Sequence, residues 1–157
     1  MRIRTLIRWG LWLALCVAPA GAWAASCTVT NSGISFGAYD PLSSQPRDTN
    51  ATIQNTCSGS AGENVSYTIG ASEVSGGSTY LTLSNGPTSL LYNLYLDAGR
   101  SVPWGNGTNG TNPIQDSITI GSGSTSKTYT IYGRIFGGQY TATSGAYADQ
   151  LIITVSY

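Results

Sequence analysis

The alternation of apolar and polar residues along short runs is the strongest constraint on the fold of this chain. At the C-terminal end, every second residue is apolar and falls on one side of an extended chain: Leu151, Ile153, Val155 and Tyr157. Alternation with period two among β-branched and aromatic residues is typical of a strand with one buried face. The sequence therefore predicts a terminal β-strand whose inward row consists of these four residues.

Similar runs recur through the chain and are separated by turns rich in Gly, Asn and Ser. They cover residues 28–36, 51–58, 64–71, 80–84, 90–96, 117–120 and 127–135. No window after residue 24 has the 3.6-residue period of an amphipathic helix. About eight short strands, with turns spaced by about 8–12 residues, predict an all-β antiparallel sandwich in a single domain.

The N-terminal segment has the pattern of a secretory signal peptide. Three arginines within residues 2–8 precede the short apolar run 11–19, which is followed by Ala22-Trp23-Ala24. Cleavage after Ala24 would leave a domain of residues 25–157 that is exported from the cytoplasm. A transmembrane helix needs roughly 20 apolar residues, and no later run is that long, so we expect no transmembrane segment.

Charge and residue types restrict the possible functions. The chain has seven basic residues, seven acidic residues and no histidine, and three of the basic residues lie in the predicted signal. No basic patch remains in the exported part, so nucleic acid is not expected as a partner. The carboxylates are scattered and there is no nucleophile–base pair or metal-ligand spacing. We therefore expect no enzyme, no metal site and no cofactor.

Two cysteines remain after removal of the predicted signal, Cys27 and Cys57. A pair of cysteines in an exported chain indicates a structural disulfide. Here it would join the first predicted strand to the second. Closing a loop of about 31 residues stabilises a fold by roughly 3.7 kcal/mol in the chain-entropy model.

An aromatic group lies near the Gly/Asn-rich stretch 100–113 and allows two interpretations. Tyr92 and Tyr95 lie on one predicted strand, and Trp104 follows in the loop. They could contact a ligand by stacking on a carbohydrate, or they could be part of the core and a packed loop. Arg134, inside another predicted strand, is either a solvated edge charge or a partner of an acid such as Asp97 or Asp149.

A set of short motifs occurs in one order from Cys27 to the C-terminus. They are the first mature cysteine, residues 36–41 (FGAYDP), Cys57, residues 91–95 (LYNLY), Trp104-Gly105, residues 132–135 (YGRI) and residues 145–157. Each motif is weak alone. Together they resemble the spore coat protein U family, which includes subunits of archaic chaperone–usher pili, and the resemblance covers essentially the whole mature chain.

This resemblance implies an immunoglobulin-like sandwich that lacks its final strand. The gap would leave a groove beside the C-terminal strand, whose edge residues would be Leu151, Ile153, Val155 and Tyr157. A periplasmic chaperone would fill the groove first, and a neighbouring pilus subunit would then fill it in the fibre, by β-strand addition. An outer-membrane usher would be the other partner in assembly. The chain would then be a structural subunit of a pilus or coat, exported to the periplasm and then to the cell surface.

The segment before Cys27 would be very short in the exported chain, which bears on its position in a fibre. Only Ala25 and Ser26 would precede Cys27, and two residues reach only about 7 Å, so we expect a terminal (tip) subunit that accepts a strand without supplying one. One alternative is a surface adhesin or carbohydrate-binding module that uses Trp104 and the tyrosines. Another is a self-complete spore-coat or envelope protein that does not polymerise.

Overall fold

The computed structural model describes residues 24–73 and 80–157, and it is all-β within these ranges, as predicted. The predicted signal peptide lies almost entirely outside the described residues. The strands are β1 (Ser26–Asn31), β2 (Arg47–Ser58), β3 (Asn64–Glu73), β4 (Leu81–Asn85), β5 (Thr88–Tyr95), β6 (Ile114–Thr119), β7 (Ser124–Ile135) and β8 (Leu151–Ser156).

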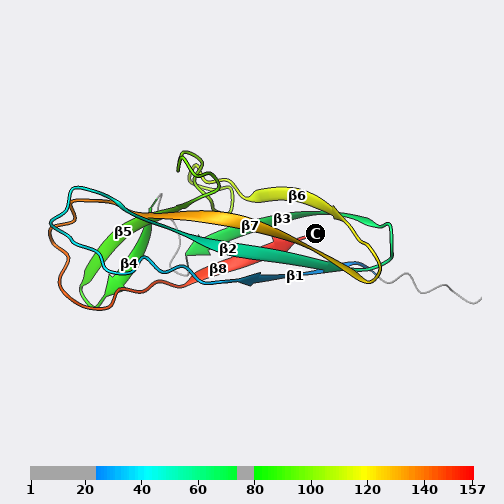
Figure 1. The fold of residues 1–157 in the computed structure, drawn as a ribbon, viewed down its shortest axis with the longest axis horizontal. Coiled ribbons are helices and arrows are strands. Elements are labelled where there is room, and N and C mark those ends of the chain that lie inside the picture. Colours follow the sequence, from blue (N-terminus) through cyan, green and yellow to red (C-terminus); the bar gives the residue numbers. More distant parts are fainter. Residues whose placement is uncertain (1–23, 74–79) are drawn as a thin grey trace, which may run out of the picture.

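The strands form two antiparallel sheets that face each other as an elongated sandwich (Figure 1). One sheet has the order β1-β2-β7-β5-β4, and the other has the order β6-β3-β8. β2 and β7 pair along their whole lengths, from Arg47 opposite Ile135 to Ser58 opposite Ser124. This long ladder positions the neighbouring segments, and the prediction of a sandwich is confirmed.

The core lies between the sheets and is built from the inward residues of both. Ile69 of β3 is fully buried, and Tyr92 of β5 and Ile131 and Ile135 of β7 are each 2% exposed. Burial of one such side chain contributes about 1.5–3 kcal/mol. Trp104 closes this core from a loop, and its indole N–H donates to the carbonyl of Ile69 at 3.3 Å.

Gly133 allows an extended segment to cross β7 at close range. A Cβ at this position would lie 2.5 Å from Ile34 Cδ1 and 2.9 Å from the ring of Phe36. Any larger residue would push the segment around residues 34–36 away from the sheet. The same segment forms one wall of a groove.

The disulfide joins the first two strands as the sequence predicted. Cys27 and Cys57 are bonded to each other and lie directly opposite in the β1–β2 ladder. Both side chains are buried, with 6% and 0% exposure. β1 is an edge strand, so the covalent bond fixes it to the sheet.

A polar network connects the two sheets on the side where β6 approaches β7. Asp116 of β6 accepts hydrogen bonds from Lys127 Nζ at 2.7 Å and from the Tyr129 hydroxyl at 2.8 Å. Tyr129 is in turn hydrogen-bonded to Tyr67 of β3. The Lys127 hydrogen bond, helped by the backbone N–H of Ser117, lowers the pKa of Asp116 from 3.8 to about 2. Side chains thus close this side of the sandwich.

Arg134 has a partner that the sequence did not suggest. Its guanidinium donates two hydrogen bonds, at 2.7 and 2.8 Å, to the carboxylate of Asp48, its ladder partner on β2. Arg100 lies 3.3 Å from the same carboxylate. The interpretation of Arg134 as the partner of an acid is therefore confirmed, but the acid is Asp48 and not Asp97 or Asp149, because the register of β2 and β7 places Asp48 directly opposite.

Removal of the disulfide tests the anchoring of β1. We expect the Cys27→Ala/Cys57→Ala variant to lose about 3–4 kcal/mol of unfolding free energy, because its unfolded state regains the freedom of the closed loop. Denaturant unfolding measures this loss, and reduced wild-type protein should match the variant. Equal stability of the variant and the oxidised wild type would contradict the assignment.

The Asp116 network predicts a dependence of stability on acid. The pKa of Asp116 is lower in the folded state, so its contribution is present above the ordinary value of 3.8 and is lost as pH falls towards about 2. Melting temperatures between about pH 5 and pH 2 should therefore fall more steeply for wild type than for Asp116→Asn. Parallel curves for the two proteins would refute this role.

Candidate functional site

The side of the sandwich opposite the Asp116 network is open. β1 and β8 run side by side there (Figure 1), each at the edge of a different sheet. Within the described residues, β1 pairs only with β2, and β8 pairs only with β3. Each strand therefore has a second edge whose backbone donors and acceptors are not used in a ladder.

A groove follows this open side, and its first half lies next to β8. It encloses about 380 Å³. Its floor is made of core side chains from the five-stranded sheet and the loop after β5: Ile53, Leu83, Tyr92, Trp104 and Ile131. One wall includes Asn31 and Ile34, and the other includes Asp149, Leu151 and Ile153. The groove therefore reaches directly into the hydrophobic core.

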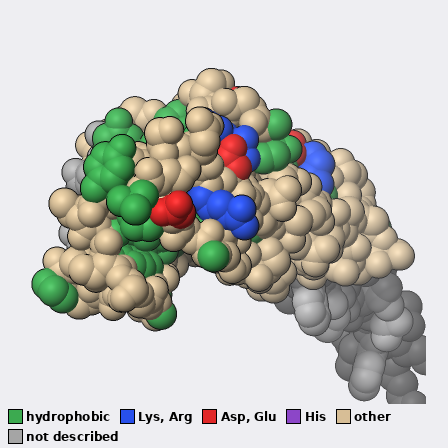
Figure 2. Space-filling view, turned by 60° about the vertical axis from the view of Figure 1, so that its left-hand side comes forward, with side chains coloured by type: hydrophobic (Ala, Val, Ile, Leu, Met, Phe, Trp, Pro, Cys, Tyr) green, Lys and Arg blue, Asp and Glu red, His purple; other side chains and the backbone are tan. Residues whose placement is uncertain are grey.

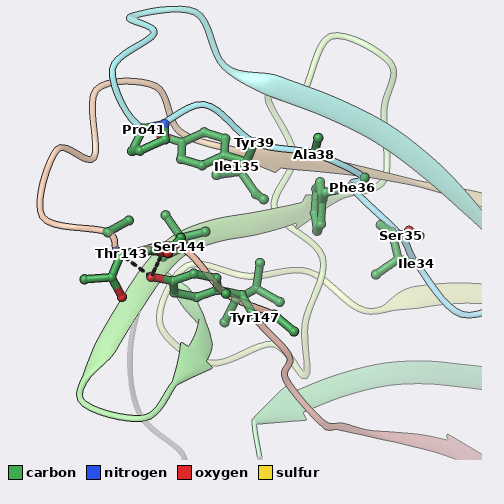
Figure 3. A pocket seen from close by; sticks show the side chains of 16 residues that line it. Ile34, Ser35, Phe36, Ala38, Tyr39, Pro41, Ile135, Thr143, Ser144 and Tyr147 are labelled. Atoms are coloured by element: carbon green, nitrogen blue, oxygen red, sulfur yellow. Dashed lines mark hydrogen bonds between the residues drawn. The ribbon is translucent and has the colours of Figure 1, made fainter.

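The second half of the groove continues between two loops and encloses about 630 Å³. Its walls are the segments 34–41 and 142–147, with Leu90 and Ile135 at its floor. In Figure 3, Tyr39 and Phe36 face Tyr147 across this space. The two halves share Ile34, Leu83 and Tyr147, so they form one continuous depression.

Hydrogen bonds from backbone and side-chain donors attach the first wall to β2. The N–H of Ser32 donates to the carbonyl of Thr52 at 3.0 Å, and the Thr49 hydroxyl donates to the carbonyl of Ser35 at 2.9 Å. Further along, Arg47 Nε donates to the carbonyl of Phe36 at 2.8 Å. The wall is therefore supported from behind along much of its length.

The second wall is attached to the β4–β5 hairpin. The side-chain amide of Gln139 pairs with the backbone of Leu91 in both directions, at 2.7 and 2.9 Å. Ser84 and Ala148 exchange two backbone hydrogen bonds, at 2.8 and 3.1 Å. The hydroxyl of Tyr147 accepts from the N–H of Thr143 at 2.9 Å. These contacts fix the chain that leads into β8.

β8 alternates as predicted over its first five residues. Leu151, Ile153 and Val155 are half-buried against the core, whereas Ile152 is 51% exposed. Tyr157 does not continue the inward row, contrary to the prediction. It follows the end of β8 and is 59% exposed. The ladder with β3 ends at Ser156, so no pairing holds the last residue in the alternation.

The three aromatic residues proposed as possible ligand contacts lie in the interior. The exposed fractions of Tyr92, Tyr95 and Trp104 are 2%, 7% and 4%. None presents an open ring face on which a sugar could stack. The three residues therefore fit the second interpretation, in which they are part of the core and a packed loop. Tyr92 and Trp104 nevertheless form part of the groove floor.

Among the described residues that line the groove, Asp149 is the one with a charged side chain, and the sequence pattern did not predict a site role for it. Asp149 Oδ2 accepts a hydrogen bond from the Tyr92 hydroxyl at 2.6 Å, and Oδ1 accepts from the N–H of Gln150 at 2.7 Å. Burial, with the hydrogen bond to Asp149, raises the pKa of Tyr92 well above its usual range. The phenol therefore remains a donor to the carboxylate. The only sequence signal was the two-residue spacing between Asp149 and Leu151.

The described part of the chain has neither a cluster of metal-ligand side chains nor a helix suited to a membrane span. Residues 24–73 and 80–157 contain no group of three or more His, Cys, Asp or Glu side chains placed to hold a metal ion. Over the same ranges, the structure has no helix with the length and apolar character that a membrane span requires.

Comparisons with known proteins add a family and a fold. The family model of the Spore Coat Protein U domain matches residues 13–154. A chain in the crystal structure of the CsuC–CsuE chaperone–tip adhesion subunit pre-assembly complex, from the archaic chaperone–usher Csu pili of Acinetobacter baumannii, has a TM-score of 0.53 and 18% identity. The match covers 85% of this chain and 40% of that one, so this chain spans less than half of its length. No curated protein matches in sequence.

The buried position of Trp104 gives a direct prediction. Trp104→Ala should lower the unfolding free energy by about 3–5 kcal/mol, because it leaves a cavity under the groove and removes a buried hydrogen bond. Tyr140, which is 65% exposed, supplies the control, and Tyr140→Ala should change stability by less than about 0.5 kcal/mol. Denaturant unfolding measures both. A Trp104→Ala variant as stable as wild type would mean that the indole is outside the core.

Proposed function

The chain belongs to the spore coat protein U domain family, and on this premise we propose that it is a structural subunit of a cell-surface pilus assembled by a chaperone–usher route. In this proposal the groove between β1 and β8 accepts an extended strand from another protein. The subunit is exported, passes through the periplasm and ends at the cell surface. It acts by assembly and not by catalysis.

The observation that carries this proposal is the pair of sheet edges that face each other across an apolar floor. Unpaired backbone N–H and C=O groups at a sheet edge are a template for another strand. β1 and β8 each have one such edge in the described structure. A strand placed between them would add to the ladder of β8 and could also pair with the edge of β1.

The side chains of the groove suit an extended occupant. The inward row of β8, formed by Leu151, Ile153 and Val155, is only half-buried against the core. Alternate side chains of an inserted strand would cover this row and contact Ile53 and Ile131 at the floor. Each square ångström of apolar surface that is covered contributes about 25 cal/mol. The two halves of the groove share Ile34, Leu83 and Tyr147, so one extended strand passes through both.

The partners follow from this geometry and from the family. We propose that a periplasmic chaperone supplies the first strand, that a neighbouring pilus subunit replaces it, and that an outer-membrane usher is the place of exchange. The similar solved chain comes from a complex of a chaperone with a tip adhesion subunit, which supports this class of partner. The tip position of the present chain stays a prediction.

Two alternative functions have less support. The carbohydrate-binding alternative assigns its ligand contacts to Tyr92, Tyr95 and Trp104, and these three rings are buried. A self-complete coat protein would pair its last strand on both sides within the chain, but in the described residues β8 pairs with β3 alone. An open β8 edge therefore favours the proposal of an accepting subunit.

Two adjacent isoleucines of β8 provide a matched test. We would measure binding of a fluorescent, end-blocked peptide of about 13 residues, with valine at inward positions and serine or threonine at outward ones. Ile153 faces the groove, so Ile153→Ala should weaken binding by about tenfold through lost apolar contact. Ile152 is 51% exposed on the other face, and Ile152→Ala should bind like wild type.

Circular dichroism and thermal melting of both variants establish that each is folded before binding is compared. Absence of peptide binding to wild type would contradict the proposed function. Equal weakening by Ile152→Ala and Ile153→Ala would also contradict it, because the peptide would then not be held at the inward face of β8.

A further inference from the structure

We propose that Asp149 selects the strand that the groove accepts, by pairing with a lysine or arginine side chain that this strand directs into the groove beside Tyr92. This inference rests on the proposed function. It adds the chemistry of the partner: an extended, mostly apolar strand with one inward basic residue.

Asp149 lies in the groove beside the apolar row of β8. It lines the same half of the groove as Leu151 and Ile153, and it precedes Leu151 by two residues, which is the repeat of an extended chain. Asp149 precedes the β3–β8 ladder, and its place in the groove lining puts a carboxylate next to the aliphatic row of β8. An inserted strand that pairs along β8 passes this carboxylate.

The carboxylate is held in place from the floor of the groove. The Tyr92 hydroxyl donates to Oδ2 at 2.6 Å, and the Gln150 backbone N–H donates to Oδ1 at 2.7 Å. The ring of Tyr92 is packed in the core with 2% exposure, so the position of this donor is set by the fold. Asp149 itself is exposed in the open groove, and its remaining acceptor positions face solvent or an occupant.

No cation within the described part of the chain neutralises Asp149. The basic residues of the described chain contact other groups. Arg100 and Arg134 pair with Asp48, Lys127 pairs with Asp116, and Arg47 Nε donates to the carbonyl of Phe36. The described residues that line the groove include no lysine or arginine. Glu73, whose charge also raises the pKa of Tyr92, adds a second negative group nearby. The groove is therefore locally negative.

When a strand occupies the groove, the negative charge of Asp149 favours strands that carry a basic side chain at this position. A strand that covers Tyr92 and Leu151 displaces water from the space around Asp149. A carboxylate that loses water without gaining a cationic partner is strongly disfavoured. A basic side chain on the strand compensates for this loss. An acidic side chain at the same place adds repulsion, so the site discriminates against wrong partners as well as for the right one.

A double-mutant cycle tests the pairing. Three peptides of the alternating valine design differ at one central inward position, which carries lysine, norleucine or glutamate. Wild-type protein should bind the lysine peptide about fivefold more tightly than the norleucine peptide, and the glutamate peptide most weakly. In Asp149→Asn, whose amide oxygen still accepts from Tyr92, the lysine and norleucine peptides should bind equally.

The control variant is Asp97→Asn, because Asp97 is a carboxylate outside the groove lining. It should keep the full preference for lysine, and about 0.5 M salt should reduce that preference in wild type. Asp149→Ser serves as a second variant if Asp149→Asn fails to fold, which circular dichroism detects.

Each result separates this inference from the proposed function. Equal binding of the lysine and norleucine peptides to wild type overturns the role of Asp149 but leaves strand acceptance intact. A lysine preference that persists in Asp149→Asn or Asp149→Ser also overturns it, because another group then supplies the charge. Failure of every peptide to bind overturns both proposals.

Discussion

The central constraint on this structure is that two strand edges, those of β1 and β8, have backbone N–H and C=O groups without a ladder partner in the described residues. Both edges lie beside a core that is incompletely covered. β1 and β8 border the same groove, and Tyr92, Trp104 and Ile131 form part of its floor. Polar backbone groups next to an apolar surface are best satisfied by another strand, which pairs with the edge and covers the floor at once. Assembly and completion of the core are then the same event.

The rest of the sandwich holds this opening in a defined shape. The Asp116 network closes the opposite side, and the disulfide fixes β1 to β2. Gln139 and the Ser84–Ala148 pair fix the chain that enters β8. A groove with supported walls does not need to reorganise when a strand enters, which lowers the free-energy cost of binding. Asp149, held by Tyr92, places a charge in a groove whose other described lining residues are uncharged.

Local patterns predicted the presence of the strands, the disulfide and the inward row as far as Val155, because these depend on alternation and cysteine count. They did not predict the strand ends, since the run 28–36 continues past Asn31, where β1 ends. Tyr157 continues the pattern but lies beyond the β3 ladder, and pattern alone does not reveal where pairing ends. The partner of Arg134 depends on the β2–β7 register, and the wall formed by residues 34–41 depends on how a loop crosses Gly133. Both are long-range features that periodicity does not contain.

Amide hydrogen exchange along β8, measured by nuclear magnetic resonance with and without the alternating valine peptide, tests the central claim most directly. In the free protein, the amides of Leu151–Ser156 that point away from β3 have no ladder partner, so slow and fast exchange should alternate along the strand. The bound peptide should protect the fast set. Uniform protection of β8 in the free protein, or no change when the peptide is bound, would contradict an open edge that receives a strand.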